Sequence, residues 1–234
     1  MAELAPAVFV LVFLAIIAVP VLITVSAIRR NRAARNPATG EGLSRLAAGK
    51  GWHHVARDDE FLARFDGYPL GGGQGRPALD LVTGTHRGRQ FACFQYAPPR
   101  RSMAPGEYPL QVDYIRVFVL SLPASVPDML IDDTSTAPRW TRKYTVGDDA
   151  FDRVFVVGTE DEKFAGRILT EPVRRWLLDR PPAGPLRFGG QHLIRWRADT
   201  GGFDACMVEP ALDYMSDLLD RVQLTHRWLA SPWP

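Results

Sequence analysis

The residues of this sequence that could carry out chemistry are carboxylates gathered in residues 132–152. They are Asp132, Asp133, Asp148, Asp149 and Asp152. Paired carboxylates perform acid–base catalysis or hold Mg²⁺. Neither a phosphate-binding element nor an activated nucleophile accompanies them, so we interpret both clusters as solvated loops. A membrane-tethered hydrolase that uses these carboxylates is kept as the alternative function.

A second group combines residue types found in metal sites. His53 and His54 precede the acidic run 58–60. Adjacent residues on a strand point to opposite faces, so at most one of the two histidines can face a given metal ion. The acidic run fits the first turn of a helix better, because carboxylates complement the helix dipole there. We therefore expect no metal.

The glycine-rich segment 71–75 invites comparison with a phosphate loop. A P-loop continues into a Lys-Ser or Lys-Thr pair that opens a helix, whereas Arg76 and Pro77 lead toward an expected strand. A dinucleotide fingerprint needs a different glycine spacing and a βα context. The segment therefore predicts an irregular loop, and we expect no cofactor.

Strands dominate the elements that must position these residues. Alternating runs at 78–85 and 89–96 flank Arg87-Gly88 and predict an antiparallel hairpin. Residues 112–122 are apolar on both faces, which predicts a central strand covered on both sides. A second hairpin is predicted at 186–197, turning at Gly189-Gly190.

Shorter strands and breaks complete the expected sheet. We expect Pro123 and Pro127 to end the central strand, with a short strand at 129–131 after them. Two more strands are predicted at 52–56 and 151–157. The pattern is typical of an α+β fold with a mainly antiparallel sheet and packed helices.

The last helix, expected at 209–229, carries one apolar stripe at alternating spacings of three and four residues. The stripe consists of Leu212, Met215, Leu219, Val222, His226 and Leu229. We interpret it as a core face and keep dimerisation as the alternative. Further helical segments are expected at 43–47, 58–65, 160–169 and 171–178.

Two stretches of the sequence resemble each other. Residues 58–65 align without gaps with residues 161–168. Both follow an expected strand and precede an expected hairpin, and repeated segments indicate repeated structure. The alignment suggests a pseudo-duplicated strand–helix–hairpin unit.

The N-terminal segment predicts a membrane anchor. Residues 4–28 contain no charged side chain, and as a helix they would be about 37 Å long, enough to span a bilayer with some tilt. Four arginines follow: Arg29, Arg30, Arg32 and Arg35. The positive-inside rule places them in the cytoplasm. A cleaved signal peptide is disfavoured because its charges would precede a shorter apolar core.

The sequence predicts three consecutive segments. Residues 1–35 form the predicted anchor, 36–42 a polar linker and 43–234 a cytoplasmic α+β domain. Cys93 and Cys206 lie far apart, so a disulfide framework is not expected. Acidic and basic residues nearly balance outside the anchor, which argues against a nucleic-acid-binding face.

One segment combines basic and aromatic residues. It contains Arg139, Trp140, Arg142 and Lys143. Such side chains interact with lipid headgroups or with a partner protein. This segment is the candidate lipid or partner surface.

Four segments carry a resemblance to a known family: DDEFLARFDGYPLGGG, VTGTHRGRQFACFQY, FDRVFVVGTEDEKFAGRIL and LRFGGQHLIRWR. They resemble an uncharacterised bacterial membrane-protein family whose members join one or two N-terminal spans to a cytoplasmic α+β domain of unknown function. The resemblance implies membrane attachment and supplies no catalytic or binding residue. We expect a single-pass protein of the cell membrane whose cytoplasmic domain binds or assembles with a protein partner, with its oligomeric state left open.

Overall fold

The computed structural model describes residues 37–71, 76–97, 114–133, 143–199 and 202–222. Its centre is a seven-stranded antiparallel sheet in the order β1-β2-β3-β4-β6-β5, with β7 paired to β4. The strands are β1 His53–Asp58, β2 Ala78–His86, β3 Arg89–Tyr96, β4 Tyr114–Asp133, β5 Lys143–Tyr144, β6 Phe155–Thr159 and β7 Leu186–Asp199. The helices are α2 Pro37–Lys50, α3 Asp149–Val154, α4 Glu162–Ile168, α5 Glu171–Asp179 and α6 Val208–Val222, with 3-10 turns η1 Phe61–Arg64 and η2 Ala205–Met207. The predicted α+β class with a mainly antiparallel sheet is confirmed.

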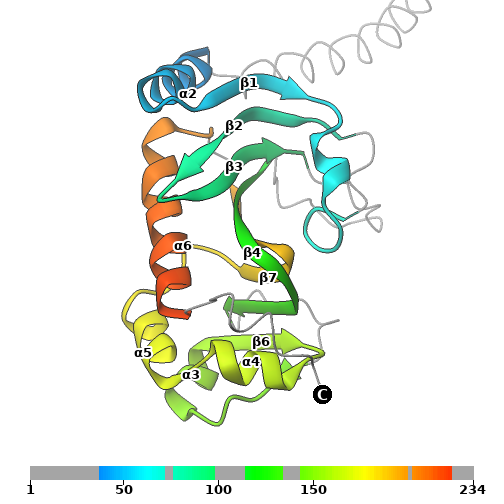
Figure 1. Cartoon of the computed structure of the whole chain (residues 1–234), viewed down its shortest axis with the longest axis vertical. Coiled ribbons are helices and arrows are strands. Elements are labelled where there is room, and N and C mark those ends of the chain that lie inside the picture. The colour runs from blue at the N-terminus through cyan, green and yellow to red at the C-terminus, as the bar shows by residue number, and fades with distance from the viewer. Residues whose placement is uncertain (1–36, 72–75, 98–113, 134–142, 200–201, 223–234) are drawn as a thin grey trace, which may run out of the picture.

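Strand β4 joins two halves of the sheet. Its residues 115–120 pair with β3, its residues 129–133 pair with β6, and β7 follows its other edge. Two register shifts between β4 and β7, on either side of Val126, bend this long pair. Figure 1 shows the result, with β1, β2 and β3 in the upper half and β6 in the lower half.

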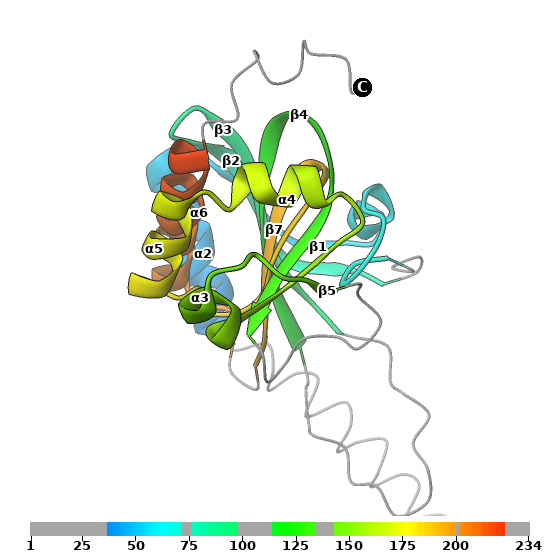
Figure 2. The same ribbon diagram turned by 90° about the horizontal axis from the view of Figure 1, so that it is seen from below.

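Each face of the sheet carries its own core. The helices cover one face, where Phe118, Leu120, Met215 and Phe188 belong to one large buried cluster. The turn η1 covers part of the other face. Figure 2 shows α2, α3, α5 and α6 together on one side of the sheet and η1, in cyan, on the other. The central strand is therefore covered on both sides, as its sequence predicts.

The apolar stripe of α6 is a core face. Leu212 and Met215 are fully buried, and Leu219 and Val222 nearly so. Since this chain's own sheet covers the stripe, it is not available as a dimer seam. His226 and Leu229, the last two stripe positions, lie outside the described residues.

The hairpin of β2 and β3 forms as predicted. Arg87 (φ +49°) and Gly88 (φ +78°) both adopt left-handed backbone conformations, which a type I′ turn requires. Prolines 123 and 127, by contrast, do not end β4. Both prolines lie at the register shifts between β4 and β7, in a part of β4 that pairs with neither β3 nor β6. Their missing N–H groups therefore remove no hydrogen bond from the sheet.

The predicted hairpin at Gly189-Gly190 is wrong, because β7 runs through it without turning. Gly190 (φ +53°) lies opposite Val126 at the register shift. At Gly189, a Cβ atom would collide with the side chain of Asp128. Gly190 therefore occurs at a bulge, and Gly189 allows a close contact with Asp128; neither forms a turn.

Other local predictions need correction. Residues 149–154 form helix α3, and the strand expected at 151–157 begins at Phe155. The helix expected at 58–65 is reduced to the turn η1, begun by Asp58, whose Oδ1 accepts the N–H groups of residues 60 and 61. Since the second hairpin is also missing, the pseudo-duplicated unit is not seen. Helices expected at 160–169 and 171–178 are confirmed as α4 and α5.

The polar linker expected at 36–42 is helical from Pro37 onward, as the start of α2. Leu43 and Ala47 of this helix are buried in the helix-side core. At Gly42 the helix lies against η2: a Cβ at this position would be 3.7 Å from the Cβ of Ala205, an ordinary van der Waals contact. Among the described residues, no helix is long and apolar enough to cross a membrane. The predicted anchor, residues 1–35 with its four arginines, lies outside them.

Candidate functional site

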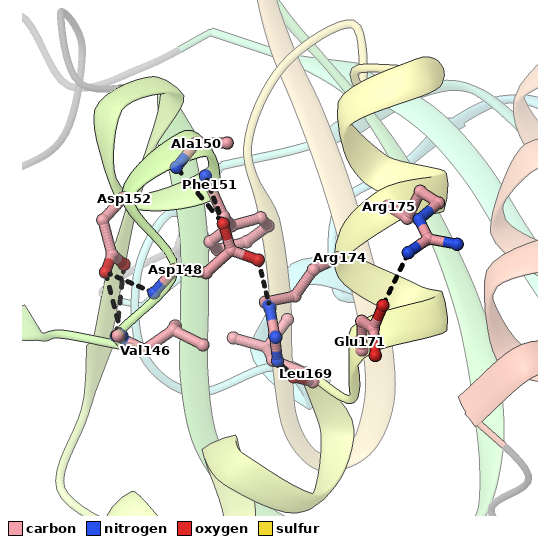
Figure 3. A network of polar contacts seen from close by, with 10 residues as sticks. Val146, Asp148, Ala150, Phe151, Asp152, Leu169, Glu171, Arg174 and Arg175 are labelled. Carbon is pink, nitrogen blue, oxygen red and sulfur yellow. Dashed lines mark hydrogen bonds and ion pairs between the residues drawn. The ribbon is translucent and has the colours of Figure 1, made fainter.

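Two of the carboxylates considered for the hydrolase alternative, Asp148 and Asp152, hold local structure together (Figure 3). The Asp148 side chain accepts the N–H groups of Ala150 and Phe151, both at 3.2 Å, and so caps α3. Its other oxygen accepts a hydrogen bond of 2.9 Å from Arg174 Nε on α5. The Arg174 guanidinium, with help from the Phe151 N–H, holds the pKa of Asp148 below its ordinary value.

Asp152 has a similar structural role. Its carboxylate accepts three successive backbone N–H groups, from Val146 at 3.1 Å, Gly147 at 3.0 Å and Asp148 at 3.2 Å. These bonds fold the segment before α3 back onto the helix, as Figure 3 shows. Both oxygens of Asp152 are thereby engaged.

The remaining carboxylates of this region do not complete a site. Asp132 is buried, and its Oδ1 accepts the N–H group of Asp133. These two residues are neighbours on β4, so their side chains leave opposite faces of the sheet. Asp149 lies in the exposed first turn of α3. Because the five carboxylates face different surroundings, the geometry does not support a shared catalytic centre.

The histidines expected not to form a metal site lie on β1. His54 Nε2 lies 3.8 Å from Asp80 Oδ1, and Gln95 donates a bond of 2.8 Å to the other oxygen of Asp80. Asp58 is occupied by the cap of η1. Within the described ranges, no group of three potential metal ligands comes together.

Of the four residues in the candidate lipid or partner surface, the structure describes one. Lys143 is exposed on β5, which pairs with β6 in the half of the sheet away from α2. Arg139, Trp140 and Arg142 lie outside the described residues.

A site that the sequence reasoning missed joins α6 to the end of α2 and to the β2–β3 turn. Four acidic residues along one stripe of α6 each meet a basic residue, and we call this set the charge ladder. Its pairs are Lys50–Glu209 at 2.6 Å, His86–Asp213 at 2.8 Å, Arg87–Asp217 at 2.7 Å, Arg87–Asp220 at 2.7 Å and Arg89–Asp220 at 2.6 Å.

Arg87 is the centre of the charge ladder. Its two terminal nitrogens bind different carboxylates, Asp217 and Asp220. The hydrogen bond that Arg87 donates to the Asp217 carboxylate is the main reason that the pKa of Arg87 is raised. A left-handed backbone costs a non-glycine residue about 1–2 kcal/mol.

A pocket of about 450 Å³ opens beside the ladder, between the β2–β3 turn, β4 and Leu219 of α6. Its lining consists of Arg87, Gly88, Arg89, Gln90, Ser121, Leu122, Pro123 and Leu219. The ladder's carboxylates are not part of the lining, so the pocket presents the two arginines backed by Asp217 and Asp220. The volume falls in the range of about 300–1,000 Å³ that is typical of ligand sites.

The charge ladder left a signal in the sequence. Aspartates at 213, 217 and 220 have helical spacing, and basic residues at 86, 87 and 89 cluster at a predicted turn. Their spacing shows that each set shares a surface. Only the fold shows that the two surfaces meet, since about 130 residues separate them.

Comparisons with known proteins give one result for the fold. No protein-family model and no curated protein sequence matches the chain. Its structure is similar to the crystal structure of the mycobacterial trehalose monomycolate transport factor A, TtfA, with a TM-score of 0.55 and 15% sequence identity. The similarity covers 84% of this chain and 98% of that one. The two chains therefore share a fold along nearly the whole of TtfA.

Proposed function

We propose that this chain is a binding or assembly module, anchored in the cell membrane by residues 1–35, whose cytoplasmic domain holds a protein partner. The observation that carries the proposal is the likeness in fold to TtfA, a protein described as a transport factor. A factor of a transport process acts by contacting other components. We extend this role to the present chain as a partner-binding component of a membrane process.

Membrane attachment rests on the sequence. The uncharged run 4–28 is long enough to span, and the arginines that follow it favour a cytoplasmic domain. The folded domain begins at Pro37, directly after this segment. A cytoplasmic reporter fused after Pro234 should be active, and activity of a periplasmic reporter alone would refute the proposed topology.

The hydrolase alternative loses support from the geometry. The carboxylate oxygens of Asp148 and Asp152 accept hydrogen bonds from the first turn of α3, from the backbone before α3 and from Arg174. A general acid or base must instead be within reach of substrate. The charge ladder engages carboxylates in the same way, in pairs with basic groups. The described carboxylates therefore favour a scaffold that presents surfaces.

Site-specific photo-crosslinking in intact cells tests the proposal. A photoreactive phenylalanine analogue replaces Tyr68, Val154 or Met207, three exposed hydrophobic residues on different elements. A control places it at Phe94, which is fully buried. We expect a discrete adduct from at least one exposed position, none from Phe94, and loss of the adduct when residues 1–35 are deleted.

The adduct must contain the same protein in repeated preparations, identified by mass spectrometry. Absence of an adduct at every exposed position, with normal amounts of the protein in the membrane fraction, would refute the partner-binding proposal. An adduct that survives deletion of residues 1–35 would leave partner binding in place and remove the need for the anchor.

A further inference from the structure

Helices α5 and α6 meet β7 at a stack of cationic and aromatic side chains. The rings of Trp176 on α5 and Tyr214 on α6 pack with 4.8 Å between their centroids. Arg221 lies over the indole, 4.8 Å from its centroid, and Arg195 of β7 lies 5.3 Å from the centroid of the Tyr214 ring. We call these four residues the arginine–aromatic stack. Figure 2 shows α5 and α6 together on the helix side of the sheet, where the stack joins them to β7.

The guanidinium of Arg195 is held in one orientation within the stack. Arg195 lies opposite Phe118 in the β4–β7 pair, and its guanidinium is 6.0 Å from the centroid of that ring. Its Nε and Nη2 atoms donate to the carbonyl of Ala183 at 3.4 and 3.3 Å. The Tyr214 hydroxyl donates to the carbonyl of Arg180 at 2.8 Å. The segment that joins α5 to β7 therefore fixes both the guanidinium and the ring beside it.

Arg195 forms no ion pair within the described part of the chain. Other arginines of the domain do pair with carboxylates: Arg57, Arg87, Arg89, Arg174, Arg175 and Arg187. Burial lowers the pKa of Arg195, and the charge of Arg197 on the same strand lowers it further. A partly buried charge without an opposite charge costs free energy, which a bound anion would reduce. The surroundings of Arg195 therefore favour the approach of a negative group.

The remaining donors of Arg195 lie where an anion can reach them. A guanidinium has five N–H donors in a planar fork. The carbonyl of Ala183 takes the edge formed by Nε and Nη2, so the end of the group remains, where Nη1 and Nη2 each carry a further N–H. Nη1 makes no hydrogen bond among the described residues, and it is not one of their buried polar atoms without a partner. Solvent therefore reaches Nη1, and the end of the guanidinium offers two parallel N–H groups, the geometry that binds a carboxylate.

From this geometry we propose that Arg195 binds an aspartate or glutamate side chain of the protein partner. The carboxylate accepts both N–H groups at the end of the guanidinium, and the methylene groups of the acidic side chain lie against the partly exposed Tyr214 ring. Tryptophan, tyrosine and arginine carry much of the binding energy of protein interfaces, which favours a protein partner over a free anion. This inference rests on the proposed partner-binding function and names the side chain by which the partner is recognised.

NMR on the full-length, ¹⁵N-labelled chain in detergent micelles tests the inference through the Nε–H signal of Arg195 and the backbone amide of Tyr214. The probe is the acetylated and amidated tetrapeptide Ala-Glu-Glu-Ala, and its matched control carries glutamine in place of both glutamates. We expect saturable shifts of both signals with the glutamate peptide. Loss of a hydrogen bond to a charged group predicts that the glutamine peptide binds about tenfold more weakly or worse.

Two variants separate this site from general charge effects. Arg195→Lys keeps the positive charge but removes the planar pair of N–H groups, and it should weaken binding of the glutamate peptide about tenfold, read at the Tyr214 amide. Arg153→Gln removes an arginine that is exposed on α3 and forms no ion pair within the described ranges, and it should leave binding unchanged. The spectrum of Arg195→Lys away from the stack reports whether the variant is folded. Where it is not, the comparison of the two peptides on the unmodified protein decides the question.

Three results would overturn the inference: no saturable shift with the glutamate peptide at millimolar concentration, equal binding of the two peptides, or unchanged binding by folded Arg195→Lys. Inorganic phosphate is the last probe. Tighter binding of phosphate than of the glutamate peptide would assign Arg195 to a phosphate-bearing ligand and would also overturn the inference. Crosslinks from the exposed positions alongside any of these results would leave the proposed function standing and remove this inference alone.

Discussion

Trp52 connects helix α2 to the sheet, and the glycine beneath it makes this connection testable. The indole Nε1–H donates to the carbonyl of Thr85 at 3.1 Å, and the ring meets Phe91 edge-to-face with 4.7 Å between centroids. Gly84 on β2 lies directly under the ring. A Cβ atom at this position would lie 2.8 Å from Trp52 Cγ and 3.1 Å from Phe91 Cε1.

We expect Gly84→Ala to lower the free energy of unfolding by about 2–4 kcal/mol. Overpacking a core costs about 1–3 kcal/mol. The indole must also move and give up its hydrogen bond to Thr85, worth about 1 kcal/mol. Phe91 is buried and cannot make room. For a chain of this size, the loss corresponds to a melting temperature lower by roughly 5–15 °C.

Thermal and urea unfolding of the full chain in detergent measure the effect, with Gly49→Ala as the matched control. Gly49 lies in α2, and a Cβ there meets nothing within 4 Å. Alanine should therefore raise stability there, by up to about 1 kcal/mol. The same exchange at the two glycines should thus give opposite signs.

A double-mutant cycle identifies the cause. If the clash with the indole destabilises Gly84→Ala, the exchange should cost much less when Trp52 is already alanine. Additive effects of the two substitutions would refute the reasoning, because the loss would then arise from the strand itself. Unchanged stability of the single variant would refute the packing of Trp52 on Gly84.

Three further predictions concern the charge ladder, the cap of α3 and the core. Asp220→Asn removes the shared carboxylate of two exposed ion pairs and should lower the free energy of unfolding by about 1 kcal/mol at low salt, with a smaller loss in 1 M salt, measured by urea unfolding. Asp148→Asn should flatten the loss of stability below about pH 4: since Arg174 lowers the pKa of Asp148, its contribution is present above the unfolded-state value and disappears as the pH falls through the lower folded-state value. Equal acid sensitivity of variant and parent would contradict this sign. Met215→Ala, at a fully buried position, should cost about 2–5 kcal/mol in denaturant unfolding, and a surface-like loss below 0.5 kcal/mol would contradict the core assignment.

The sequence predicted elements whose signals are local. The β2–β3 hairpin needs a turn with two left-handed residues, and Arg87-Gly88 lies between two alternating runs. Helix α6 carries its apolar stripe at helical spacing, and that stripe is buried as expected. In both cases the pattern of neighbouring residues is sufficient to predict the element, without knowledge of the element that packs against it.

The wrong predictions concern residue types that are common in two kinds of local structure. Gly189-Gly190 and Pro123 have the composition of turns, yet they occupy bulges in long strands. The choice between turn and bulge depends on whether a second strand continues alongside. For β4 that strand is β7, whose paired residues lie about 55–85 positions further along the chain. Local patterns contain no information on such a partner.

The candidate site was out of reach for the same reason. The arginines of the β2–β3 turn and the aspartates of α6 lie about 130 positions apart, and no local pattern connects them. The pocket is lined by the β2–β3 turn, by residues 121–123 of β4 and by Leu219 of α6. A contact between segments this far apart in the sequence leaves no local pattern from which it could be predicted.

The early start of α2 gives the proposed anchored protein a defined geometry. One residue, Asn36, separates Arg35 from the helix, and the helix is fixed to the sheet through Leu43 and Ala47. At its first turn, a Cβ on Gly40 would lie 3.6 Å from Asp80 Oδ1 on β2. From Asp80, β2 runs away for about seven residues to Arg87, or about 23 Å at roughly 3.3 Å per residue. The pocket therefore lies at the end of the β2–β3 hairpin that is farthest from the start of α2.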